Sequence, residues 1–153
     1  MIARFLALAS VVALAAVGVA ADAHVRISPA TVAAGSTATL TFRCPNERTA
    51  TSTVKLAIEL PPGLPLSAIA VPPVAGWHIV VSRRDGTVTW EGGSIPPGAA
   101  GVFTIVIRPI PAAGPLLFRA VQTYGNGEVV RWIQARAPGE PEPPFPAPVL
   151  TVR

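Results

Sequence analysis

The sequence predicts an all-β domain, and three features of the chain support this prediction. Proline accounts for 18 of the 153 residues and glycine for 13, so few stretches are long enough for a regular helix. The segments between them are rich in Val, Ile and Thr, which favour strands. Several segments alternate apolar and polar residues, as a half-buried strand does. In segment 39–44 the alternation places Leu40, Phe42 and Cys44 on one face.

The expected strands follow one another along the chain, separated by turn-forming residues. Asp85-Gly86 and Asn126-Gly127 predict tight hairpin turns, and Pro-Pro-Gly at 61–63 and 96–98 closes strands. The proline-rich segment 138–148 predicts an extended loop or edge that leads into a last strand. Such spacing indicates a two-sheet β-sandwich of the immunoglobulin-like or cupredoxin-like type. The candidate strands are 24–28, 37–44, 52–60, 77–82, 87–91, 102–108, 116–124, 128–134 and 149–152.

The first 23 residues have the pattern of a Sec signal peptide. Arg4 precedes an apolar stretch from Phe5 to about Ala21, and Ala21-Asp22-Ala23 is an A-x-A cleavage site. An N-terminal membrane anchor is the alternative, but the alanine-rich stretch with its cleavage box favours removal. We therefore expect residues 1–23 to be cleaved and residues 24–153 to form one domain without a membrane anchor. The expected location is periplasmic or extracellular.

Composition argues against several classes of function. The net charge of +4 comes from scattered arginines, with no run longer than Arg83-Arg84, so a nucleic-acid partner is not expected. A single cysteine excludes an intramolecular disulfide. No G-x-S-x-G, H-E-x-x-H, C-x-x-C or glycine-rich phosphate motif is present. A blue-copper electron-transfer site needs two histidines, a cysteine and usually a methionine. The only methionine, Met1, lies in the expected signal peptide, so this type of site is not expected. These observations favour a protein that is not an enzyme.

His24 is the most informative residue, because cleavage after Ala23 makes it the first residue of the mature chain. A terminal amine and the imidazole Nδ1 of the same residue can chelate one metal in a six-membered ring. Two nitrogens completed by an oxygen suit the tetragonal preference of Cu(II). The alternative is an exposed terminus without a metal. The residues alone leave both interpretations open.

The chain resembles a known family, the YcnI-like bacterial copper-binding proteins, which carry a histidine after the signal peptide. The resemblance spans nearly the whole mature chain. The order and spacing of the segments are more specific than any one of them. In order, they are HVRISP at 24–29, AGS at 34–36, FRCPNE at 42–47, LP at 60–61, PVAGW at 73–77, VRW at 130–132 and PAPV at 146–149.

The resemblance implies a cupredoxin-like sandwich that binds Cu(II) through one terminal histidine, called a mono-histidine brace. By motif, the metal-site residues are His24, Glu47 and Trp132. A carboxylate is a suitable third ligand and offsets part of the charge of the ion. The protonated indole has no lone pair to donate, so Trp132 is expected to cover the metal. The implied task is copper trafficking or homeostasis, as a chaperone or buffer that serves a membrane copper transporter or a cuproenzyme.

Each of these residues also has a simpler interpretation. Glu47 fits a solvated loop acid, and Trp132 fits a core tryptophan, as Trp77 and Trp90 do more strongly. Only the family resemblance favours the metal roles.

Two further residues allow other copper chemistry. His78 suggests the alternative of a two-histidine brace, as in copper-dependent polysaccharide monooxygenases. It lies, however, between Trp77 and Ile79 on an expected strand. A surface or partly buried structural histidine is favoured. Cys44 could bind Cu(I) as a thiolate. Because alternation places Cys44 on the same strand face as Leu40, we favour a role as a small, buried apolar side chain instead.

Two other classes of function stay open at this level. One is a copper-dependent oxidase or monooxygenase that uses open coordination positions. The other is a metal-free immunoglobulin-like adhesion or assembly module, for which replacing His24 would have no effect.

Overall fold

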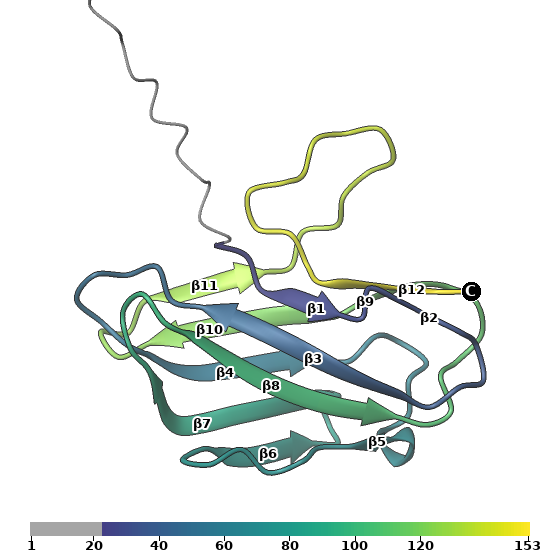
Figure 1. Cartoon of the computed structure of the whole chain (residues 1–153), viewed down its shortest axis with the longest axis horizontal. Helices are drawn as coiled ribbons and strands as arrows, with labels where there is room; N and C mark the ends of the chain where they lie inside the picture. Colours follow the sequence, from purple (N-terminus) through teal and green to yellow (C-terminus); the bar gives the residue numbers. More distant parts are fainter. Residues whose placement is uncertain (1–22) are drawn as a thin grey trace, which may run out of the picture.

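The computed structural model describes residues 23–153, so the expected signal peptide lies outside the described residues except for Ala23. The described chain forms twelve strands and one short 3₁₀ turn (Figure 1). Within it, no helix has the length and hydropathy needed to cross a membrane. The elements are β1 (Arg26–Ser28), β2 (Thr31–Val32), β3 (Ala38–Pro45), β4 (Thr53–Glu59), η1 (Leu66–Ala68), β5 (Ile69–Ala70), β6 (His78–Ser82), β7 (Thr87–Ile95), β8 (Ala100–Ile107), β9 (Gly114–Leu117), β10 (Arg119–Tyr124), β11 (Val129–Trp132) and β12 (Val149–Val152).

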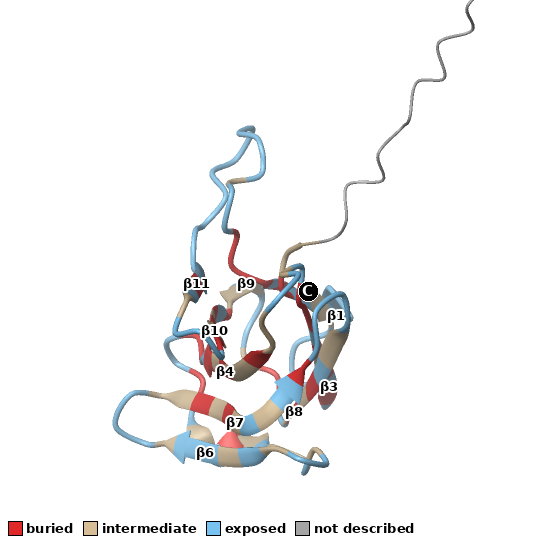
Figure 2. Cartoon of the chain, turned by 90° about the vertical axis from the view of Figure 1, so that its left-hand side faces the viewer, coloured by how far each residue is buried: buried red, intermediate tan, exposed pale blue. Residues whose placement is uncertain are grey.

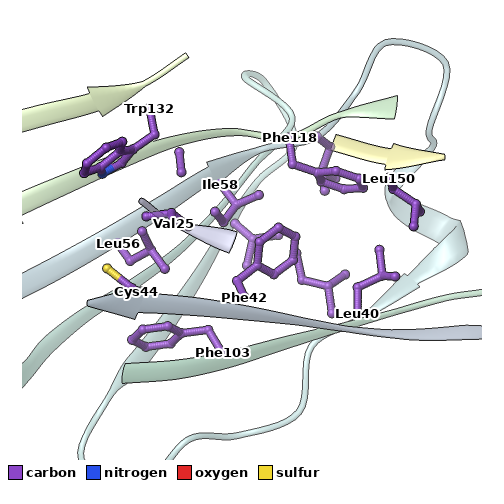
Figure 3. Packing of buried hydrophobic residues seen from close by; sticks show 14 of the residues in the cluster. Val25, Leu40, Phe42, Cys44, Leu56, Ile58, Phe103, Phe118, Trp132 and Leu150 are labelled. Atoms are coloured by element: carbon purple, nitrogen blue, oxygen red, sulfur yellow. The ribbon is translucent and has the colours of Figure 1, made fainter. Parts of the chain in front are cut away.

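Two larger sheets face each other and enclose the core, which confirms the predicted β-sandwich. One sheet has the order β1-β3-β8-β5, and the other has the order β11-β10-β4-β7-β6. Buried residues lie between them (Figure 2). Leu40, Phe42 and Cys44 of β3 are all fully buried, as the alternation predicts (Figure 3). Phe42 meets Phe118 edge to face, with ring centroids 5.4 Å apart.

A small third sheet, β2-β12-β9, was not expected from the sequence. It forms because the predicted strand 116–124 is divided at Phe118. Before Phe118, β9 pairs with β12, and after it, β10 pairs with β4. The backbone amide of Phe118 donates to the carbonyl of Pro148 at the point of change. Strands β2 and β5 have only two residues each, too few for alternation to predict.

The hairpin turns and the proline-rich loop lie where the sequence predicts them. Gly86 (φ +61°) closes β6 to β7 and Gly127 (φ +88°) closes β10 to β11, both in the left-handed region that glycine adopts readily. The chain between β11 and β12, hereafter the 133–148 loop, projects from the sandwich (Figure 1). Its base is closed by a parallel bridge between Gln134 and Pro146.

Candidate metal centre

His24 is held at one end of the sandwich by the residues that follow it. Val25 is only 2% exposed and belongs to the core. Strand β1 then pairs antiparallel with β3, with Arg26 opposite Arg43. Because β3 ends two residues after Arg43, this register brings His24 close to the loop that leaves β3. The fold therefore places the predicted mature terminus beside the segment that carries Glu47.

The three residues predicted for the metal site line one pocket of about 170 Å³, hereafter the Glu47 pocket. His24 lies before β1, Glu47 follows β3, and Trp132 ends β11. Glu47 is exposed, whereas Trp132 is only 5% exposed. The pocket is lined by His24, Glu47, Trp132, Ala23, Pro45, Arg48, Tyr124, Val130, Pro144 and Phe145.

The imidazole of His24 has an unusual environment. Its ring centroid lies 5.5 Å from that of Trp132, with the planes tilted by 59°. Its Nδ1 atom is buried and has no hydrogen-bond partner within residues 23–153. That atom lies 3.7 Å from Oε1 of Glu142, beyond hydrogen-bond distance. A buried polar atom without a partner is costly, so a bound ligand is one physical explanation for it.

Trp132 is oriented by a buried glutamine, Gln122, which no sequence motif marks. The indole Nε1 donates to Oε1 of Gln122 at 3.1 Å. The Nε2 of Gln122 donates to the carbonyl of Pro45 at 3.0 Å and to Oγ1 of Thr53 at 2.7 Å. The indole nitrogen is thus engaged on the core side, which leaves the ring itself to cover the pocket. A polar residue in the inward phase of β10, between Ala120 and Tyr124, was the signal in the sequence.

Asn46 fixes the loop that carries Glu47. It is 1% exposed, and its Nδ2 donates to the carbonyls of Thr51 and Ile95, each at 2.9 Å. Its Oδ1 accepts from the backbone amide of Arg48 at 2.9 Å, which closes a turn around Glu47. Glu47 is therefore an exposed carboxylate on a backbone that is fixed on both sides.

Arg48 forms the charged side of the pocket. Its Nε donates to Oε2 of Glu128 at 3.0 Å, and its Nη2 contacts the other oxygen of the same carboxylate. The guanidinium lies 5.0 Å from the ring centroid of Tyr124. Its hydrogen bond lowers the pKa of Glu128, and burial raises the pKa of Tyr124. Glu128 thus balances a positive charge that stands directly beside Glu47.

Side chains alone do not complete a metal site in the described part of the chain. Within residues 23–153, no three His, Cys, Asp or Glu side chains lie close enough together to hold one ion. A metal at His24 therefore needs a donor of another kind. Ala23 and His24 both line the Glu47 pocket, so the peptide bond that joins them is close to it.

Comparisons with known proteins identify the family. Residues 24–86 and 81–152 match the family described as a domain of unknown function, DUF1775. The chain belongs to this family. It is 32% identical over 117 residues to the copper-binding protein CutI of Bacillus subtilis (strain 168), a match that covers 73% of this chain and 56% of CutI. The chain thus spans little more than half the length of that relative. The resemblance to the YcnI-like proteins is confirmed.

A solved structure supports the same family fold. An uncharacterized protein from Nocardia farcinica with an immunoglobulin-like fold superimposes with a TM-score of 0.74 at 34% identity. The match covers 84% of this chain and 97% of that one. This agreement confirms the immunoglobulin-like sandwich.

Two residues weighed for copper chemistry lie elsewhere in this DUF1775 domain. Cys44 is buried and lines neither pocket that contains His24. Burial raises the pKa of its thiol to about 12, so it stays protonated at neutral pH. His78 is exposed on β6, whereas Trp132 ends β11 at the opposite edge of the five-stranded sheet. The structure does not bring His78 to His24.

The other two tryptophans are part of the apolar interior. Trp90 is fully buried, and Trp77 is half-buried against the core. Their ring centroids lie 5.2 Å and 5.0 Å from that of Phe103. Neither lines the Glu47 pocket, which agrees with the core role favoured for both.

Proposed function

We propose that this chain is an exported protein that binds Cu(II) at His24 after a Sec signal peptide, residues 1–23, is removed. The ligands are the new terminal amine, the His24 Nδ1 and the Glu47 carboxylate, and Trp132 covers the ion. The observation that carries the proposal is the buried Nδ1 atom without a hydrogen-bond partner, beside a pocket that Glu47 and Ala23 also line. The similarity to the copper-binding protein CutI supports copper as the metal.

Cleavage after Ala23 supplies the donor that the side chains lack. It replaces a peptide nitrogen, which does not bind metals readily, with an amine that shares a six-membered chelate ring with Nδ1. Two nitrogens and one carboxylate oxygen match the ligand preference of Cu(II). The indole wall limits solvent access without using its own nitrogen, which Gln122 holds.

The task that fits this site is copper trafficking or homeostasis, by ligand exchange and without catalytic turnover. An ion with an exposed carboxylate ligand can be transferred through a mixed-ligand intermediate, which a closed, buried cage resists. Such a protein acts as a chaperone or buffer in the periplasm or outside the cell. Its partner is a membrane copper transporter or a cuproenzyme that receives the ion.

The test is a Cu(II) titration of protein that begins at His24, beside protein with one extra glycine before His24. The buried apolar core within the described residues starts at Val25, so both chains retain it in full. We expect one tightly bound equivalent, nitrogen coupling in the electron paramagnetic resonance spectrum, and loss of tight binding in the extended chain. Glu47→Ala should also weaken binding without unfolding, because the side chain is exposed. Equal binding by the native and extended chains, or by neither, contradicts the proposal.

A further inference from the structure

A second carboxylate lies close to His24, in a different pocket from Glu47. Glu142 and His24 both line another pocket of about 230 Å³, hereafter the Glu142 pocket. Oε1 of Glu142 lies 3.7 Å from the buried Nδ1 of His24. His24 is thus the wall shared by the Glu47 pocket and the Glu142 pocket. No motif in the sequence marks Glu142.

The loop that carries Glu142 is anchored at its base. The backbone amide of Gln134 donates to the carbonyl of Phe145 at 2.9 Å, and that of Phe145 donates to Oε1 of Gln134 at 2.8 Å. The Nε of Arg136 donates to the carbonyl of Glu140 at 2.8 Å. The Gln134–Phe145 bonds tie the two arms of the 133–148 loop together at its base, and the Arg136–Glu140 bond closes a turn in the arm that precedes Glu142.

The same loop lines both pockets that contain His24. Phe145 lines the Glu47 pocket, and its ring centroid lies 5.6 Å from that of Trp132. Glu142 lies three residues earlier and lines the Glu142 pocket. One segment of chain therefore extends the aromatic cover over the proposed site and places a carboxylate beside the imidazole.

We propose that Glu142 is a second carboxylate ligand of the copper held at His24, an inference that rests on the proposed function. Nitrogen and oxygen donors lie about 2.0–2.2 Å from a bound zinc, and copper is similar, so in a tetragonal site neighbouring donors are about 3 Å apart and opposite donors about 4 Å apart. The 3.7 Å between Nδ1 and Oε1 lies between these two separations. The two atoms can therefore reach one ion with little movement of the loop. The exposed Glu47 side chain must turn toward the same ion to complete the set, because within residues 23–153 no three such side chains already lie close enough together.

Charge supports the same role. Neutral amine and imidazole nitrogens with the Glu47 carboxylate leave one positive charge on bound Cu(II), which a second carboxylate neutralises. Arg26 and Arg136 also line the Glu142 pocket, and Glu142 is the one acid among the described residues that line it. Without its carboxylate, none of the described residues that line this pocket would offset the charge of a dication. Hard oxygen ligands also favour Cu(II) over Cu(I).

The experiment compares Glu142→Gln with Glu140→Gln in protein that begins at His24. Glu140 is an exposed acid on the same loop, so its variant makes the same change in net charge two residues away. Copper affinity is measured by competition with a chelator, and the ligand set by the hyperfine splitting in electron paramagnetic resonance. We expect Glu142→Gln to weaken Cu(II) binding by about tenfold or more and to change the splitting. Glu140→Gln should match the unmodified protein.

The outcomes separate the two proposals. If the unmodified protein binds Cu(II) tightly but Glu142→Gln has the affinity and spectrum of Glu140→Gln, Glu142 is not a ligand and the proposed function stands. If the unmodified protein does not bind Cu(II), the proposed function fails and the role of Glu142 fails with it. Because Glu142 is exposed, its variant should keep the circular dichroism spectrum of the unmodified protein.

Discussion

The two ends of the sandwich are built in different ways. Within the described chain, the buried polar side chains are Asn46, Thr53 and Gln122, and their hydrogen bonds all converge where β3 ends, next to the Glu47 pocket. Away from this end the interior is apolar, as around Leu40 and Leu150 (Figure 3). One end is ordered by directional bonds, and the other by apolar packing alone.

Because of this difference, we expect one end to determine the stability of the domain and the other to determine how the side chains of the site are oriented. Burial of apolar surface is non-directional and contributes most of the favourable free energy of folding. A hydrogen bond adds only about 1 kcal/mol net, but it fixes where its partners point. The apolar end should therefore determine how stable the domain is. The polar end should determine how Trp132 and the Glu47 loop face His24.

Leu40→Ala tests the apolar end and should have the largest effect on stability. Leu40 is fully buried opposite Ile105, so truncation leaves a cavity that should lower the free energy of unfolding by about 2–5 kcal/mol. Urea denaturation measures this loss. Copper stoichiometry and affinity, measured while the variant is folded, should stay those of the unmodified protein. A folded variant with impaired copper binding would show that the two ends are not independent.

Gln122→Leu tests the polar end and should affect copper affinity more, and stability less, than Leu40→Ala does. It removes the acceptor of Trp132 Nε1 and the donor to Pro45, so we expect a loss of about 1–3 kcal/mol in the free energy of unfolding. Although smaller than the loss in Leu40→Ala, this change should weaken Cu(II) binding, because Trp132 and the Glu47 loop lose their common anchor. Denaturation and copper titration of both variants give the comparison.

A double-mutant cycle with Trp132→Phe identifies the bond responsible. Phenylalanine keeps an aromatic ring but has no N–H to donate, so Gln122→Leu should cost less in that background. Equal costs in both backgrounds would show that the bond from Trp132 to Gln122 contributes nothing to stability.

Sequence predicted the apolar part of this molecule better than the polar part. Alternation placed Leu40, Phe42 and Cys44 correctly, because burial on one face of a strand follows from phase alone. It missed the division of one predicted strand at Phe118, where neighbouring residues pair with different sheets. The alternation of apolar and polar residues does not show which neighbouring strand a segment pairs with.

For the candidate site, the prediction rested on a cleavage site and a family resemblance. These named His24, Glu47 and Trp132, and the fold brings all three to one pocket, although their role as ligands stays a prediction. Gln122 and Glu142 were missed because their partners are distant in sequence: Gln122 bonds Pro45 from 77 residues away. A polar residue in a sequence does not reveal which distant groups it meets.

Glu128→Gln tests the rim of the polar end, and its effect on stability should be the smallest. Arg48 lowers the folded pKa of Glu128 below its ordinary value of 4.5, so the ion pair contributes stability above that value. The contribution is lost as pH falls through the lowered pKa. The melting temperature of the variant should thus be lower by about 3 °C or less at about pH 7, and the difference should shrink as the pH falls below 4.5.

The matched control for Glu128→Gln is Glu59→Gln, because Glu59 likewise accepts a hydrogen bond from an arginine, Arg119, at 3.0 Å. Stability alone should not distinguish the two variants clearly. Copper affinity should distinguish them, because Glu128, unlike Glu59, balances the positive charge of Arg48 beside Glu47. We expect Glu128→Gln to weaken Cu(II) binding about two- to fivefold at low salt, and Glu59→Gln to leave it unchanged. Equal Cu(II) affinities of the two variants would mean that the charge of Arg48 does not affect how the Glu47 carboxylate binds the ion.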